Sequence, residues 1–144
     1  MSEGSSGSAS GEGKERISVV AAVIEQDGRY LLTKRAAKAV LPGYWEFPGG
    51  KVEPGETPRQ ALAREVRERI CVDVQVGPLL ARRVHDYGDY EVELSIYDAN
   101  ILAGSVRPGT VAEVAWVPRQ KLGDYSFPPA DREAMDLLLG RRVQ

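Results

Sequence analysis

The chain has 144 residues, of which 42% are hydrophobic and 28% are charged, which suits one globular domain with a sizeable core. Its formal net charge of −2 gives no basic field for a phosphate backbone, so we expect no nucleic-acid polymer as partner, whereas a single nucleotide stays possible. One cysteine excludes an intramolecular disulfide, and no apolar run has the length of a membrane span or a secretory signal. We therefore expect a cytoplasmic protein with no membrane partner, either a monomer or a homodimer.

The first residues differ in composition from the rest of the chain. Residues 1–13 are almost wholly Ser, Gly, Glu and Ala, which cannot bury enough surface to become ordered. We expect a flexible leader over residues 1–14 and a single domain over residues 15–144.

Alternating apolar residues and turn signals predict the elements of this domain. Turns are predicted at Asp27-Gly28, Gly77-Pro78 and Pro108-Gly109. In chain order we predict strands at 17–25, 30–33 and 44–47, a helix from Thr57 or Pro58, strands at 72–76, 79–84, 90–97 and 113–117, a helical turn at 118–122 and a helix at 131–139. Strands, one helix, more strands and a last helix predict an α/β fold with a mixed β-sheet between helices.

The central helix has a clear start and two different faces. Thr57 suits the cap, Pro58 the first helical position and Gln60 the capping box. The apolar stripe consists of Leu62, Val66 and Ile70. Glu65 and Glu68 fall on the other face. We expect one face to pack against the core and the other to carry charge.

A glycine-rich loop at residues 49–55 precedes this helix. If it brings Glu53 and Glu56 beside Glu65 and Glu68, four carboxylates gather, and such a group is unfavourable unless a cation neutralises it. Oxygen ligands alone suit a hard ion such as Mg²⁺ or Mn²⁺. The alternative is a solvated helix face on which Glu65 and Arg69 form a surface ion pair of only ~0.3–0.5 kcal/mol.

The spacing of this stretch resembles the signature of the Nudix hydrolases. That signature is Gly, five residues, Glu, seven residues, Arg-Glu, an aliphatic residue, any residue, Glu-Glu, any residue, Gly and an aliphatic residue. The positions in register are Gly50, Glu56, Arg64, Glu65, Val66, Glu68 and Val72. Two positions depart from it, since Arg69 replaces the second Glu of the pair and Cys71 replaces the glycine. The resemblance implies the Nudix α/β/α sandwich.

The resemblance also implies an activity, the metal-dependent hydrolysis of a nucleoside diphosphate linked to another group X. Glu65 and Glu68 would be ligands of Mg²⁺ or Mn²⁺ or a general base, with the Gly50 carbonyl near the metal. Arg64 would orient the carboxylates, and Glu56 would support the helix and loop. The alternative for Glu56 and Arg64 is a purely structural ion pair.

Arg69 is the main departure, because a guanidinium has only donors and stays charged, so it cannot coordinate a cation. In the family a further acidic ligand often precedes a Trp-Val pair, but here Thr110 stands in that neighbourhood. Glu113 is the nearest acid, and Glu91 and Glu93 are other candidates to complete the site.

Cys71 and His85 have simpler interpretations. Cys71 stands where a left-handed conformation would cost roughly 1 kcal/mol or more, so we expect the helix end to be rearranged and Cys71 to be a small buried hydrophobe. We expect His85 to be a loop or strand-end residue.

A second resemblance concerns the substrate. Three segments, Arg35-Ala36-Ala37, 46–51 and 127–131, are similar to those of MutT-type nucleoside triphosphate pyrophosphohydrolases, including those that remove 8-oxo-dGTP or act on CTP analogues. By this resemblance Arg35 would hold phosphates, Phe47 would line the base pocket and Asp131 would read the base edge. Phe47 is equally suited to the hydrophobic core. Asp131 is equally suited to cap the last helix. The alternative function is a Nudix-fold nucleotide-binding module with weak or no catalysis.

Overall fold

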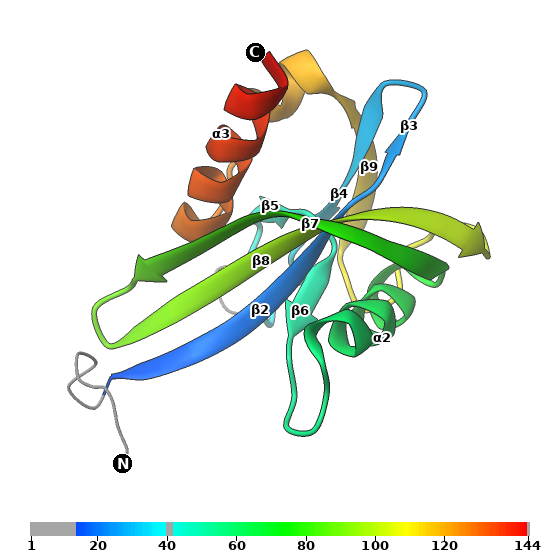
Figure 1. The fold of residues 1–144 in the computed structure, drawn as a ribbon. Coiled ribbons are helices and arrows are strands. Elements are labelled where there is room, and N and C mark those ends of the chain that lie inside the picture. The colour runs from blue at the N-terminus through cyan, green and yellow to red at the C-terminus, as the bar shows by residue number, and fades with distance from the viewer. Residues whose placement is uncertain (1–13, 40–41, 144) are drawn as a thin grey trace.

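The structure, a computed structural model, describes residues 14–39 and 42–143 (Figure 1). The predicted leader lies outside the described residues except for Lys14, whose Nζ is ion-paired with Asp86 at 2.7 Å. The elements are β2 (Glu15–Val23), β3 (Glu25–Gln26), β4 (Arg29–Lys34), β5 (Trp45–Glu46), β6 (Gly49–Lys51), α2 (Pro58–Ile70), β7 (Asp73–Asp86), β8 (Tyr90–Ala103), β9 (Glu113–Pro118), the 3-10 helix η1 (Arg119–Asp124) and α3 (Pro129–Val143). Within the described ranges no helix has the length and hydrophobicity needed to cross a membrane.

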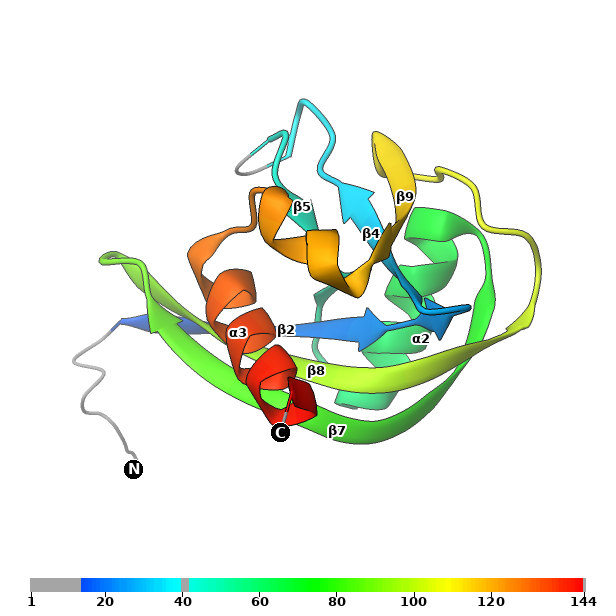
Figure 2. The same ribbon diagram turned by 90° about the horizontal axis from the view of Figure 1, so that it is seen from above.

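The strands form two sheets (Figure 2). The first has the order β6-β2-β8-β7, in which β2 and β8 are parallel and the other pairs are antiparallel. In the second, β4 pairs with β3, β5 and β9, all antiparallel. The prediction of a mixed sheet is therefore confirmed.

The two long helices cover opposite faces of the first sheet (Figure 1). Because side chains alternate along a strand, β2 serves both sides. Val20 and Ala22 belong to the core cluster that contains α2, whereas Ala21 and Val23 belong to the cluster that contains α3. This layering confirms the predicted α/β/α sandwich.

Helix α2 begins as the sequence predicts. Thr57 Oγ1 accepts from the Gln60 N–H at 3.1 Å, and the Gln60 side chain accepts from the Thr57 N–H at 2.9 Å. The whole predicted stripe, Leu62, Val66 and Ile70, is fully buried. The expected rearrangement of the helix end is wrong, because Cys71 adopts the left-handed conformation (φ 67°, ψ 30°) and its N–H donates to the Arg67 carbonyl.

Two predicted boundaries are also wrong. Gly77-Pro78 is not a turn, since β7 runs through it with register irregularities between Val76 and Ala81. Proline has no N–H for a ladder, and an irregularity of this kind accommodates it within a long strand. The glycine-rich loop predicted at residues 49–55 begins later, because Gly49–Lys51 forms strand β6, which pairs with β2 in the first sheet.

Candidate active site

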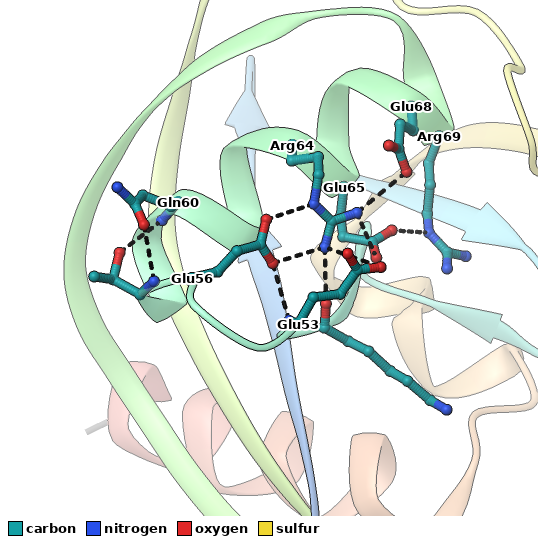
Figure 3. Close-up of polar contacts among 9 residues, drawn as sticks. Glu53, Glu56, Gln60, Arg64, Glu65, Glu68 and Arg69 are labelled. Atoms are coloured by element: carbon teal, nitrogen blue, oxygen red, sulfur yellow. Dashed lines mark hydrogen bonds and ion pairs between the residues drawn. The ribbon is translucent and has the colours of Figure 1, made fainter.

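Arg64 is the centre of the loop and helix that carry the signature (Figure 3). Its Nε and Nη2 donate to the two Glu56 oxygens at 2.6 and 2.9 Å. Nη2 also donates to the Lys51 carbonyl at 3.1 Å, and Nη1 donates to Glu65 Oε2 at 3.2 Å and Glu68 Oε1 at 3.3 Å. One guanidinium therefore joins β6, the loop and two turns of α2.

Glu56 holds both the loop and the Arg64 side chain in place. Its Oε1 accepts from the Glu53 N–H at 2.9 Å. The hydrogen bonds from Arg64, followed by the Glu53 N–H, lower the pKa of Glu56 to about 2. Glu56 therefore stays ionised as a bidentate partner of Arg64 throughout the physiological range.

Glu65 is buried, with only 7% of its surface exposed, so it does not lie on a solvated helix face. Strand β6 approaches it closely, since a Cβ on Gly50 would overlap the Glu65 carboxylate. The predicted pair with Arg69 is present, because Arg69 Nε donates to Glu65 Oε1 at 2.9 Å. Both oxygens of Glu65 are thus held by arginines, Arg64 on one side and Arg69 on the other.

The loop between β8 and β9 docks on the end of α2. Its backbone N–H groups satisfy helix carbonyls that would otherwise lack partners. The bonds run from Arg107 to Ile70 (3.2 Å), from Gly109 to Arg69 (2.8 Å) and from Thr110 to Glu68 (3.2 Å). A Cβ on Gly109 would overlap the Glu68 carbonyl, so the glycine permits this contact. The Thr110 backbone consequently lies against that of Glu68, and its side chain is not acidic.

The other candidate acids are engaged elsewhere. Glu113 pairs with Lys34 at 3.4 Å, and Glu91 pairs with Arg16 at 3.0 Å. The other two groups, Glu93 and His85, contact Arg82 at 3.7 Å and Glu133 at 2.8 Å, respectively. None of these contacts joins the Arg64 cluster.

The acidic residues of the site do not by themselves provide the ligands that a divalent ion needs. Across residues 14–39 and 42–143 no three His, Cys, Asp or Glu side chains are grouped to hold a metal. Glu65 already accepts from two arginines, and Glu68, 53% exposed, contacts Arg64. The site does not fit an ion held by the protein alone. The carboxylates of Glu65 and Glu68 and the carbonyl of Gly50 suit only an ion whose remaining ligands are phosphate oxygens and water.

A cavity of about 510 Å³ adjoins this cluster. Its lining includes Gly50, Lys51 and Arg69 together with Glu46 and Asp131, and Arg69 lies close enough to Glu46 to oppose the rise in its pKa that burial causes. Its lining also includes the aromatic residues Phe47, Tyr87 and Tyr90. Phe47 is buried and packs against Phe127 with ring centroids 6.0 Å apart.

Glu46 and Asp131 form the buried acidic part of the cavity. Arg35 Nη2 donates to Glu46 Oε1 at 3.0 Å, so Arg35 lies against a carboxylate and not at the Arg64 cluster. Burial, with the nearby Glu46 carboxylate second, raises the pKa of Asp131 to about 8. Burial also raises the pKa of Glu46, against the opposing effect of Arg35. Asp131 therefore keeps a proton at neutral pH and can both donate and accept.

Asp131 does not cap α3. The helix begins at Pro129, two residues earlier than the apolar pattern suggests, so Asp131 lies within its first turn. Sequence reasoning assigned no role to Glu46, although it stands directly before Phe47 in the segment that resembles MutT-type enzymes. Only the fold brings Glu46 and Asp131 together.

Comparisons with known proteins agree with this geometry. A NUDIX domain model matches residues 19–137. The chain is 34% identical over 127 residues to a CTP pyrophosphohydrolase of Escherichia coli (strain K12), a match that covers 88% of this chain and 94% of that protein. It is 40% identical over 85 residues to an 8-oxo-dGTP diphosphatase of Proteus vulgaris, covering 58% of this chain and 76% of that protein.

Solved structures give the same result. The solution structure of the E. coli ORF135 protein matches with a TM-score of 0.77 and 32% identity, covering 90% of this chain and 93% of that one. The crystal structure of a MutT protein from Methanosarcina mazei Go1 matches with a TM-score of 0.81 and 26% identity, covering 91% and 98%. Together with the spacing from Gly50 to Val72, these matches establish that the chain belongs to the Nudix family of hydrolases.

Proposed function

We propose that this protein is a nucleoside triphosphate pyrophosphohydrolase, which releases a nucleoside monophosphate and pyrophosphate. The observation that carries the proposal is the cavity, because one lining reaches from Gly50 and Arg69 to Glu46 and Asp131. It thus brings a polar edge for a base and Arg69 of the signature helix together in one cavity. The activities named for the CTP pyrophosphohydrolase of E. coli and the 8-oxo-dGTP diphosphatase of P. vulgaris support the same reaction class.

The acidic part of the cavity is the proposed base site. A protonated Asp131 presents a donor and an acceptor side by side, which matches an edge with an amino group next to a ring nitrogen, as in cytosine or adenine. Phe47 supplies an apolar wall. Arg35 holds Glu46 in place, so we propose this supporting role for it in preference to phosphate binding.

The reacting phosphates are proposed to lie beside Gly50, with the nucleotide arriving as its Mg²⁺ or Mn²⁺ complex. Such an ion screens phosphate charge and lowers the pKa of bound water. Glu65 and Glu68 are the carboxylates of this chain that would hold it, with the Gly50 carbonyl nearby. Glu68 is half exposed and can accept a proton from the attacking water, whereas Glu65 is fixed by Arg64 and Arg69.

A substrate panel tests the proposal. CTP, dCTP, ATP, 8-oxo-dGTP, ADP-ribose and a dinucleotide polyphosphate are incubated with the full chain and Mg²⁺ or Mn²⁺, and products are separated by anion exchange. We expect triphosphates to be hydrolysed faster than the other classes. Absence of turnover of every compound would refute the proposal.

A binding module without hydrolysis is the second candidate, and the contact between Arg69 and Glu65 favours it. In that case nucleotide raises the melting temperature by mass action while no product forms. For either function we propose a cytoplasmic location, where nucleoside triphosphates are abundant. Size-exclusion chromatography distinguishes a monomer from a homodimer.

A further inference from the structure

Arg69 lies in the wall of the cavity, where it is hydrogen-bonded to Glu65 and close enough to the Glu46 carboxylate to oppose the rise in pKa that burial causes there. Its Nε donates to the buried Glu65 carboxylate at 2.9 Å, the only hydrogen bond of this side chain to any described residue. The side chain is 29% exposed and lines the cavity with Gly50 and Lys51. Its terminal nitrogens point away from Arg64 (Figure 3). The outer part of the guanidinium is therefore oriented and available to a ligand.

A guanidinium in this state is an anion-binding group. Its planar fork matches two oxygens of a phosphate, and the bond through Nε reduces the freedom that binding would otherwise remove. Charge agrees with this use, because the cavity lining holds three cations, Arg35, Lys51 and Arg69, against the carboxyl groups of Glu46 and Asp131 and of Glu65, the partner of Arg69. One of those carboxyl groups, Asp131, is protonated at neutral pH.

The contact between Arg69 and Glu65 also disfavours a divalent cation as the main group that binds the phosphates. An ion on Glu65 Oε1 must displace the Arg69 Nε–H, and Thr110, whose backbone docks on the end of α2, has no carboxylate to offer it. We propose that Arg69 binds the phosphates of the nucleotide directly, so that nucleotide binding does not require a divalent ion. This inference rests on the proposed function for the identity of the ligand.

Calorimetric titration with CTP and with pyrophosphate, each in EDTA and in Mg²⁺, tests this role. We expect wild type to bind both ligands in EDTA with a Kd within ~3-fold of that in Mg²⁺. The change Arg69→Gln removes a charge-assisted contact and should weaken binding in EDTA at least ~10-fold. Arg67→Gln is the matched control, because Arg67 belongs to the same helix, is 70% exposed and pairs with Asp73 outside the cavity.

A charge reversal makes the test two-sided. Arg69→Glu should bind neither ligand measurably in EDTA and should recover binding when Mg²⁺ is added, and its melting temperature verifies that it is folded. The inference is overturned if wild type binds only with Mg²⁺, or if Arg69→Gln binds pyrophosphate in EDTA as wild type does. Mg²⁺-only binding accompanied by turnover would leave the proposed function intact, whereas no binding and no turnover under any condition would refute both.

Discussion

The substitution Arg69→Glu should increase hydrolysis of the nucleotide's Mg²⁺ complex. In wild type the guanidinium carries one positive charge against Glu65, with Nε 2.9 Å from Oε1. A divalent ion ~5 Å from that charge is repelled by about 7 kcal/mol at an effective dielectric near 20. Side-chain movement and salt reduce this figure.

The change Arg69→Glu removes the repulsion between the guanidinium and the ion. It also frees Glu65 Oε1 and adds a second carboxylate at this place. We expect kcat/KM to rise at least ~10-fold, about 1.4 kcal/mol, and the Mg²⁺ concentration for half-maximal rate to fall. The double change with Thr110→Glu should lower that concentration further, because the Thr110 backbone lies against that of Glu68.

The assay is the release of pyrophosphate from the best substrate over a range of Mg²⁺ concentrations. Arg67→Glu makes the same change of charge on the same helix outside the cavity, and it should leave both quantities near wild type. If Arg69→Glu has the rate and the Mg²⁺ requirement of wild type, Arg69 does not oppose the ion and the reasoning fails.

Three further predictions concern stability. Gly50→Ala should lower the free energy of unfolding in urea by about 1–3 kcal/mol, because its Cβ would overlap the Glu65 carboxylate, which Arg64 and Arg69 hold in place, and an unchanged value would contradict this packing. Cys71→Gly should be more stable than Cys71→Ala by about 1 kcal/mol in thermal melts, reversing the usual helix preference, because φ is 67°. The pKa of Asp131 is about 8 when folded against 3.8 as its ordinary value, so its stabilisation is complete below pH 3.8 and is lost as the pH rises through 8. The free energy of unfolding of wild type should therefore fall by up to about 1.4 kcal/mol per pH unit over this range, and Asp131→Asn should remove that contribution. Denaturation of both proteins at several pH values measures it, and an identical slope in both would show that Asp131 is ionised.

Local features were predictable from the sequence. The Thr57 and Gln60 capping box and the apolar stripe of α2 depend on neighbours within a few residues, and both are present. The ion pair of Arg64 with Glu56, which the sequence analysis gave as the alternative for these two residues, is also present and joins one loop to one helix turn.

Long-range contacts were not predictable in the same way. Periodicity put Glu65 on a charged face, but β6 covers it because Gly50 has no side chain. Glu46 and Asp131 come from different elements, and only the packing of α3 brings them to one cavity. The segment Gly77-Pro78 has the composition of a turn, yet continuous pairing with β8 prevailed over that local preference.

The most direct test of the catalytic account is the product analysis of CTP hydrolysis by wild type, Glu68→Gln and Glu113→Gln with Mg²⁺. Glu113→Gln is the matched control, because Glu113 has an exposure similar to that of Glu68 but pairs with Lys34. Wild type and Glu113→Gln should release CMP and pyrophosphate in equal amounts, and Glu68→Gln should be slower by at least ~100-fold. Release of CDP and orthophosphate, or an equal rate for Glu68→Gln, would contradict the account.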